Sequence, residues 1–358
     1  MDRLRIAFFG LTNSGKSTLV NAICGQEVSL VSAIPGTTTD PVRKIAELPG
    51  LGPCVLIDTA GIDDESLLGD ARKRLTRSVM DETDLAVVLH ADSDPQGLVA
   101  ALLAQLQDAE IPTVVYRREE GVPSLLERLA AAAPQEEARF LTGDLVGAGS
   151  SVVLVMPQDS EAPKGRLILP QVQVLRELLD RGCAAHACTP DALPATLRSL
   201  SGTPDLVITD SQVFGFVNKA IPAECPLTSF SVLLAAAKGD VRAFVDGARA
   251  IDRLRPGDRV LIAEACTHVP NTEDIGRVKI PALLRRRVGA LEVDIAAGND
   301  FPEDLSPYAL IIHCGACVAN ARLVRSRIKK ARRAGVPITN YGIAIAFLQG
   351  ILDRISLP

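Results

Sequence analysis

Cysteine and histidine side chains gather in two short stretches near the C-terminal end of this chain. Cys266 and His268 form a Cys-x-His pair, and His313, Cys314 and Cys317 form a His-Cys-x-x-Cys stretch further along. Thiolate and imidazole groups are the ligands that zinc and iron–sulfur centres select, and the Cys-x-x-Cys spacing lets two sulfurs bind one centre. Because the chain has only four histidines and eight cysteines, this clustering predicts a metal site.

The residues alone leave the kind of metal open. A structural zinc would be held in a closed tetrahedral site of three cysteines and one histidine. A 4Fe-4S cluster would be held by Cys266, Cys314 and Cys317, with the remaining iron open or bound by His268 or His313. Buried structural cysteines and a redox dithiol are further alternatives, but a dithiol leaves Cys266 and His268 unexplained.

A phosphate-binding loop lies at the other end of the chain. The stretch Gly10-Leu-Thr-Asn-Ser-Gly-Lys-Ser17 follows the apolar segment Ile6–Phe9 and precedes a predicted helix. Its backbone N–H groups can wrap a β-phosphate, Lys16 can reach the β- and γ-phosphates, and the Ser17 hydroxyl can bind Mg²⁺. This succession of strand, loop and helix predicts a nucleoside triphosphate site.

Two downstream motifs extend the nucleotide site. Asp58-Thr-Ala-Gly61 ends an apolar strand, where the carboxylate can hold the Mg²⁺ shell and the Gly61 N–H can meet the γ-phosphate. Together with the intervening Pro35-Gly-Thr-Thr-Thr-Asp40, these motifs resemble the translation-factor-like class of small GTPases. The resemblance implies GTP with Mg²⁺ as the ligand and Thr38 as the switch residue that reaches the metal, with its neighbours Thr37 and Thr39 as alternatives. The residues predicted to contact the nucleotide or Mg²⁺ are Gly10, Asn13, Ser14, Gly15, Lys16, Ser17, Thr18, Thr38, Asp58 and Gly61.

The same resemblance bears on catalysis. Asn13 occupies the loop position that helps to coordinate K⁺ in potassium-activated GTPases of this class, although an asparagine there can also serve only the turn. Ile62 stands where Ras-type enzymes carry a catalytic glutamine. No catalytic side chain is therefore assigned.

The guanine-reading motif of such GTPases has no counterpart in this sequence. After the predicted strand Pro112–Tyr116 the chain continues Arg117-Arg-Glu-Glu-Gly, and Val122–Ala132 is predicted to be the terminal helix of the domain. An Asn-Lys-x-Asp motif, whose aspartate pairs with guanine, is missing. We interpret the base-reading loops as deleted and expect weak or base-indifferent nucleotide binding.

Three segments of alternating strands and helices are expected to position these residues. Residues 1–140 are predicted to form a doubly wound, P-loop GTPase-like α/β domain, and residues 141–256 and 257–358 two further α/β domains. In the last segment, the predicted strand Arg259–Ala263 ends shortly before Cys266, and Leu310–Ile312 ends directly before His313. Sites in open α/β sheets form beyond the carboxyl ends of the strands, so both cysteine stretches are expected to meet at one edge.

Composition excludes some partner classes and favours an intracellular protein. The chain has 358 residues, of which 47% are hydrophobic, and a formal net charge of −5, so neither a nucleic-acid nor a membrane partner is predicted. The basic run Arg325–Arg333 is interpreted as the solvated face of a helix. The apolar N-terminal segment runs directly into the phosphate loop, which favours a buried strand over a signal peptide and a cytoplasmic location.

Longer motifs resemble the HydF family, the GTPases that mature iron–iron hydrogenases. They are GLTNSGKS and DTAGIDD near the start, APKGRLILPQVQ at residues 162–173, and EACTH, IHCGACV and GVPITNYGIAIAF near the end. The resemblance therefore covers essentially the whole chain. It implies a GTPase domain, a dimerisation domain and a cluster-binding domain, in that order.

The resemblance also implies a function. Its cluster ligands fall on Cys266, Cys314 and Cys317, and Val269 stands where the family often carries a second histidine. The implied protein is a homodimeric scaffold that carries a 4Fe-4S cluster, receives a di-iron subcluster precursor and delivers it to apo iron–iron hydrogenase. Two radical-SAM maturases would be its upstream partners. The alternative function is a GTPase switch protein with a structural zinc site.

Overall fold

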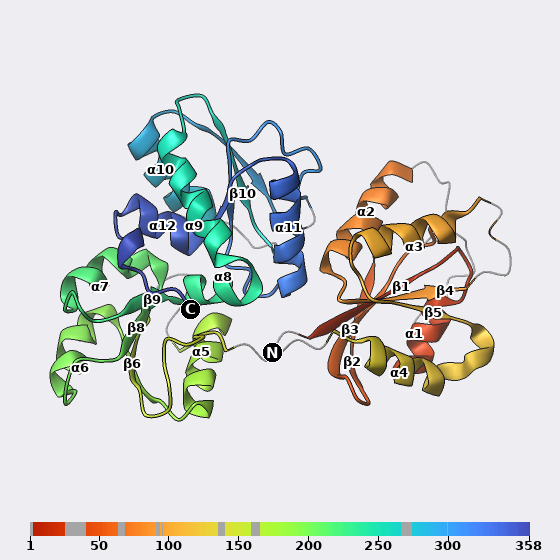
Figure 1. Ribbon diagram of the computed structural model, residues 1–358, viewed down its shortest axis with the longest axis horizontal. Coiled ribbons are helices and arrows are strands. Elements are labelled where there is room, and N and C mark those ends of the chain that lie inside the picture. Colours follow the sequence, from red (N-terminus) through yellow and green to blue (C-terminus); the bar gives the residue numbers. More distant parts are fainter. Residues whose placement is uncertain are drawn as a thin grey trace. The chain divides into compact units, whose positions relative to one another are not determined.

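The computed structural model describes residues 3–25, 41–63, 69–90, 94, 96–134, 140–158, 165–265, 274–298 and 300–358. The chain forms two compact units, residues 1–137 and 138–358, and each is considered by itself (Figure 1). Both units are built from mostly parallel sheets with helices packed against them, which confirms the predicted α/β class. In the described part of the chain, no helix is long and apolar enough to cross a membrane.

The first unit is a five-stranded sheet covered on both faces. Its strand order is β2-β3-β1-β4-β5, and only the pairing of β2 with β3 is antiparallel. The strands are β1 (Leu4–Phe9), β2 (Val42–Leu48), β3 (Gly52–Asp58), β4 (Leu85–Leu89) and β5 (Thr113–Tyr116). The helices are α1 (Lys16–Cys24), α2 (Gly69–Glu82), α3 (Leu98–Asp108) and α4 (Gly121–Ala132).

Side-chain alternation along β1 explains why both faces need a cover. Ile6 and Phe8 join one hydrophobic cluster, together with residues of α1 and α4, whereas Ala7 and Phe9 join another, together with residues of α2 and α3. Figure 1 shows these two pairs of helices on opposite sides of the sheet. A strand that is apolar at every position is the expected signature of such a doubly covered parallel sheet.

The second unit contains two four-stranded parallel sheets with the same topology. The first has the order β7-β6-β8-β9 and the second the order β11-β10-β12-β13. The strands of the first sheet are β6 (Ser151–Val155), β7 (Ala184–Cys188), β8 (Leu206–Thr209) and β9 (Leu227–Ser229). Those of the second are β10 (Arg259–Ala263), β11 (Glu292–Ala296), β12 (Leu310–His313) and β13 (Ile338–Asn340).

Eight helices accompany the described strands of this unit. They are α5 (Leu169–Asp180), α6 (Leu193–Ser199), α7 (Phe214–Ala220), α8 (Phe230–Lys238), α9 (Val241–Arg249), α10 (Ile280–Val288), α11 (Ala321–Arg333) and α12 (Tyr341–Leu348). In each sheet the last strand runs straight into a helix whose N-cap side chain accepts a backbone N–H, Ser229 before α8 and Asn340 before α12.

One hydrophobic core connects the two sheets. Val153 of the first sheet and Leu261 of the second belong to the same cluster of buried side chains. Helix α9 packs so closely on β13 that a Cβ placed on Gly247 would lie 1.9 Å from the Ile338 carbonyl oxygen. The two C-terminal segments are therefore packed together and do not form separate bodies.

Two strands were not predicted from the sequence. β2 is an edge strand with mostly exposed or half-exposed side chains, so it lacks the apolar run that marks a buried parallel strand. β13 has only three residues, Ile338–Asn340, and is too short for any periodicity to show. Both lie beside strands that were predicted, β3 and β12.

Candidate functional site

The phosphate loop joins β1 to α1 in the geometry that an anion site requires. Gly15 caps α1 in the left-handed region, with φ of 96°, and Asn13 also has a positive φ of 60°. Lys16 is buried, and its Nζ donates hydrogen bonds to the carbonyls of Gly10 at 3.1 Å and Leu11 at 2.8 Å. Burial lowers the pKa of Lys16, against the opposing charges of Asp58 and Asp63.

Two residues predicted to hold magnesium, Ser17 and Asp58, lie together in the first unit. Asp58 ends β3, which pairs directly with β1, and its carboxylate forms a hydrogen bond with Ser17. Burial raises the pKa of Asp58, while that hydrogen bond and the charge of Lys16 act in the opposite direction. Thr38 lies outside the described residues, so its predicted contact with Mg²⁺ stays a prediction.

The segment after Asp58 rests directly on the phosphate loop. A Cβ placed on Gly61 would lie 2.1 Å from Thr12 Oγ1 and 2.7 Å from the Thr12 backbone nitrogen, so only glycine fits. The Thr12 N–H donates a 2.5 Å hydrogen bond to Asp63. Burial opposes ionisation of Asp63, but the bonds from Thr12 outweigh it and hold the pKa of this carboxyl below its ordinary value. Asp63 was missed in the sequence because no motif position demands it.

Three of the predicted metal residues, His313, Cys314 and Cys317, lie at the carboxyl edge of the second sheet of the second unit. β10 and β12 pair in parallel, with Ala263 opposite His313. The Cys314 sulfur accepts backbone N–H groups from Ala265 at 3.1 Å and from Ala316 at 3.4 Å. Cys266 and His268 lie outside the described residues, although Cys266 directly follows Ala265 in the chain.

His313 is fully engaged by neighbouring groups. Its Nδ1 lies 2.8 Å from the Cys314 carbonyl oxygen and its Nε2 lies 3.0 Å from Arg327 Nη1. Burial and the adjacent Arg327 charge lower the pKa of His313 to about 3, so the ring is neutral. A neutral ring that donates from Nδ1 accepts from Arg327 at Nε2, and metal binding through either nitrogen would have to replace one of these contacts. The predicted ligand role of His313 stays a prediction.

Two buried cations hold the backbone around the cysteines. Lys238, at the end of α8, donates from Nζ to the carbonyl oxygens of Ala316 at 3.0 Å, Cys317 at 3.4 Å and Ala319 at 2.7 Å. We call residues 314–320, between β12 and α11, the cysteine loop. Lys238 is only 5% exposed, and Ala316 in the loop has a left-handed φ of 52°. The ammonium group thus stabilises a loop backbone that a non-glycine residue adopts at some cost.

Arg327 is the second buried cation and corrects the interpretation of the basic run Arg325–Arg333. Its side chain is 2% exposed, whereas the run was predicted to be a solvated helix face. The guanidinium donates to the carbonyl oxygens of Glu264 at 3.2 Å and Gly298 at 2.6 Å, and it lies over the Phe301 ring. The prediction was wrong at this position because a helix periodicity does not reveal which turn faces buried carbonyls.

A tyrosine completes the surroundings of Cys314. The Tyr341 hydroxyl is buried and has no hydrogen-bond partner among the described residues. Burial, with Cys314 and Glu264 nearby, raises the pKa of Tyr341 well above its ordinary value. Within the described ranges, no set of three or more histidine, cysteine or acidic side chains is grouped as a complete metal site. The two cysteines of this loop, the N–H groups directed at the Cys314 sulfur and the Tyr341 hydroxyl nevertheless suit a thiolate-bound centre. The predicted third ligand, Cys266, lies outside the described residues.

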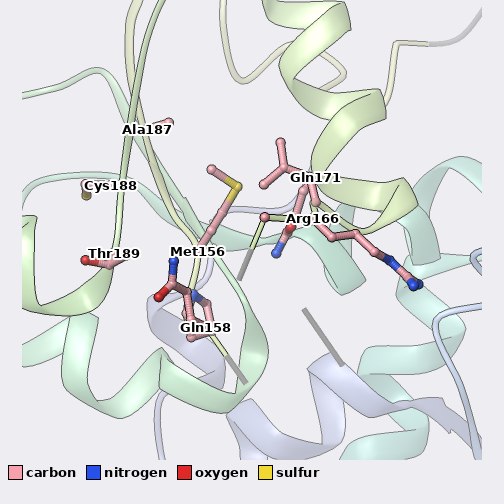
Figure 2. A pocket seen from close by; sticks show the side chains of 10 residues that line it. Met156, Gln158, Arg166, Gln171, Ala187, Cys188 and Thr189 are labelled. Atoms are coloured by element: carbon pink, nitrogen blue, oxygen red, sulfur yellow. The ribbon is translucent and has the colours of Figure 1, made fainter. Parts of the chain in front are cut away.

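An open pocket of about 420 Å³ lies elsewhere in this unit, at the carboxyl ends of β6 and β7 (Figure 2). Met156, Gln158 and Thr189 line it beside the start of α5. Its buried amide, Gln171, is already occupied, since it accepts from the Ile168 N–H and donates to Asp210. Figure 2 shows the Arg166 side chain extending away from Met156 and Thr189. None of the residues predicted to bind a ligand lines this pocket.

Family models match three consecutive stretches of the chain. The hydrogen maturase F dimerization domain matches residues 141–239, and the hydrogen maturase F tetramerization domain matches residues 242–358. These two models together cover more than half of the sequence. The chain belongs to the HydF family. The model of a GTPase domain, described as 50S ribosome-binding GTPase, matches residues 5–119.

Curated GTPases are similar to part of this chain. GTPase Der of Caldicellulosiruptor saccharolyticus is 36% identical over 124 residues, which are 34% of this chain and 26% of that protein. The tRNA modification GTPase MnmE of a Methylobacterium species is 34% identical over 178 residues, 42% of this chain and 36% of that protein. The chain therefore spans about a quarter to a third of the length of these relatives.

Solved structures resemble the HydF chain more distantly. Era of Aquifex aeolicus bound to GDP and aluminium fluoride is 17% identical, with a TM-score of 0.28, over 56% of this chain and 99% of that one. NFeoB of S. thermophilus bound to GDP, aluminium fluoride and K⁺ is 18% identical, with a TM-score of 0.23, over 36% of this chain and 62% of that one. Because both TM-scores are low, the assignment rests on the family models.

The HydF segments divide the second unit at the cysteine site. The dimerization segment ends directly after α8, and the tetramerization segment contains α9, the second sheet and the cysteine loop. Lys238, which holds the cysteine loop, therefore belongs to the dimerization segment, while the loop belongs to the tetramerization segment. The backbone position of the cysteine loop thus depends on the dimerization segment as well as on the tetramerization segment.

Proposed function

We propose that this chain is an iron–sulfur scaffold that assembles a di-iron subcluster precursor and delivers it to apo iron–iron hydrogenase. The observation that carries the proposal is the cysteine loop of a HydF chain, held at a sheet edge with two N–H groups directed at the Cys314 sulfur. Hydrogen bonds to sulfur are among the groups that tune iron–sulfur centres. Nothing in the family models or the described residues favours the structural zinc alternative.

In this proposal Cys266, Cys314 and Cys317 hold a 4Fe-4S cluster. When bound, such a cluster with three protein ligands offers one iron for an exchangeable ligand. The Ala265 and Ala316 N–H groups orient the Cys314 sulfur, and Lys238 fixes the loop between the two loop cysteines. The unpaired Tyr341 hydroxyl supplies a hydrogen-bond donor on the same side as Cys314. His268 and His313 are the candidate fourth ligands.

The first unit is proposed to bind GTP with Mg²⁺. Lys16 and the loop N–H groups would hold the phosphates, and Ser17, Thr38 and Asp58 would hold the metal, directly or through water. The hydrogen bond between Ser17 and Asp58 supports this assignment because it holds the hydroxyl and a carboxylate oxygen side by side, where both can contribute to the coordination of one Mg²⁺ ion. Asn13, with its positive φ on the loop, is the proposed K⁺ contact.

Self-association is supported by the dimerization and tetramerization segments, and we propose a homodimer as the basic form. β7 is an edge strand of its sheet and is partly exposed along its whole length. On the adjoining helix α5, the side chains of Leu169, Val172 and Leu179 are 45%, 46% and 54% exposed. An unpaired edge beside exposed apolar side chains is suited to contact with a second copy.

Hydrogenase and radical-SAM maturases are the other proposed partners, and the cytoplasm, where thiols stay reduced, is the proposed location.

The scaffold proposal is tested by anaerobic reconstitution with iron and sulfide, followed by metal analysis and EPR of the reduced protein. We expect about four irons and four sulfides per chain. Cys314→Ser should lose the cluster, and Cys188→Ser, a matched change at a strand end of the other sheet, should keep it. Stoichiometric zinc without iron uptake would contradict the proposal.

A further inference from the structure

An arginine directly after β5 lies against the phosphate loop. β1, β4 and β5 are parallel neighbours, so the residue that follows β5 emerges at the same sheet edge as the loop that follows β1. Arg118 begins a short 3₁₀ helix there, Arg118–Glu120. A Cβ placed on Gly15 would lie 2.8 Å from Arg118 Nη2, so the guanidinium occupies the space above the glycine of the loop.

The guanidinium of Arg118 is available to a ligand. Its side chain is exposed and forms no hydrogen bond or ion pair with a residue in the described part of the chain. The backbone that carries it is fixed, because the Glu120 N–H donates to the Arg117 carbonyl at 3.0 Å and Arg128 pairs with Glu120 at 2.5 Å. A guanidinium on a fixed backbone beside the N–H groups of a phosphate loop is suited to bind an anion.

The charge of the loop itself supports the same conclusion. Lys16 stands close to two carboxylates, Asp58 and Asp63, which offset its positive charge. A bound triphosphate carries several negative charges, and guanidinium groups bind phosphate oxygens in a bidentate manner. Arg118, beside Gly15, would bring the additional positive charge.

We propose that Arg118 binds the phosphates of the nucleotide and thereby replaces affinity that other GTPases take from the base. The inference rests on the proposed nucleotide site and specifies its ligand class. The segment that would read guanine is reduced to Arg117–Glu120, and the cation it contributes faces the phosphate loop. Phosphates are common to all nucleoside triphosphates, so the site selects for the triphosphate with little regard to the base.

The test is calorimetric titration of the full-length protein with non-hydrolysable GTP and ATP analogues in the presence of Mg²⁺. The wild-type protein should bind both with affinities within about tenfold of each other, and inorganic tripolyphosphate should compete. Arg118→Ala should weaken both analogues by about tenfold or more, the size expected for one charge-assisted contact, and Arg118→Lys should restore part of the loss. Arg117→Ala, an exposed neighbour with the same charge, should change either affinity by less than about twofold.

The outcomes separate this inference from the proposed nucleotide site. If wild-type protein binds neither analogue, both are wrong. If wild-type protein binds and Arg118→Ala binds equally well, the role of Arg118 is refuted while the nucleotide site stands. A loss confined to the GTP analogue would also refute it, because it would assign Arg118 to base recognition. Circular dichroism of each variant checks that the first unit is folded.

Discussion

Replacing Lys238 by methionine should destabilise the second unit and release the cysteine loop. Lys238 is 5% exposed, and its ammonium group donates to three carbonyl oxygens, those of Ala316, Cys317 and Ala319. Methionine fills a similar volume but donates no hydrogen bond. The substitution therefore leaves three carbonyls without this donor, next to a residue, Ala316, whose φ is 52°.

The size of the effect follows from these contacts. The Ala316 carbonyl also accepts the Ala319 N–H at 3.2 Å, and the Cys317 contact is partly buried, so the Ala319 carbonyl loses the most. A buried carbonyl left unpaired costs about 1–3 kcal/mol. Removing a buried charge regains part of its desolvation penalty, which is several kcal/mol for an ion in a protein interior. Since the groups left behind are neutral carbonyls, the unpaired carbonyl sets the cost, and we expect a loss of about 1–3 kcal/mol in the free energy of unfolding.

The assay is guanidinium unfolding of the full chain, combined with hydrogen exchange read by mass spectrometry. Lys238→Met should lower the unfolding midpoint of the second unit and accelerate exchange in residues 314–320. Lys219→Met, an exposed lysine of α7, is the matched control and should change the free energy by less than about 0.5 kcal/mol. If the two variants unfold alike and exchange in the cysteine loop is unchanged, Lys238 does not hold this loop.

Three further predictions concern the close contacts of each unit. Gly61→Ala should abolish nucleotide binding in a calorimetric titration, because the new Cβ would lie 2.1 Å from Thr12 Oγ1; retained affinity would contradict the contact. In an open helix, Gly247→Ala would raise the free energy of unfolding by about 1 kcal/mol. Here the new Cβ would lie 1.9 Å from the Ile338 carbonyl oxygen, so an unfolding experiment should show a loss of about 2 kcal/mol instead. The control Gly202→Ala, where a Cβ would meet nothing within 4 Å, should be nearly neutral in the same experiment. Since the folded pKa of Asp63 lies below its ordinary value, its contact with Thr12 contributes stability above pH 3.8 that is lost as pH falls through the folded pKa. Asp63→Asn should flatten this acid dependence of the unfolding midpoint, and an unchanged dependence would refute it.

The buried strands were predictable because their side chains carry a local signal. β1 and β10 are mostly apolar runs of the kind that a doubly covered parallel sheet produces, and the predicted strands Ile6–Phe9 and Arg259–Ala263 lie within two residues of their structural bounds. β2 escaped prediction because its alternating polar pattern depends on an edge position in the sheet, which only the fold decides. β13 escaped because three residues are too few to show a period.

The candidate sites divide in the same way. The phosphate loop could be recognised from sequence because its residues are adjacent in the chain and its chemistry demands glycines and a lysine at set positions. Asp63 and Arg118 could not, because each acts through a contact with the loop, at Thr12 and Gly15, that arises only when neighbouring strands bring them to one edge.

The sequence by itself determined the α/β class, the phosphate loop, the grouping of Cys314 with Cys317 and membership of the HydF family. These features are properties of neighbouring residues or of long motifs. Only the tertiary structure decided that Lys238 and Arg327 are buried and hold the backbone around the cysteines. From the sequence, each is a basic residue of a helix and would be expected to face solvent. The physical reason is that burial of a cation depends on carbonyl groups from other segments. Those carbonyls, at Ala319 and Glu264, lie far away in the chain. Ala319 meets Lys238 only after the two sheets have packed together, and Glu264 meets Arg327 only after β10 has paired with β12.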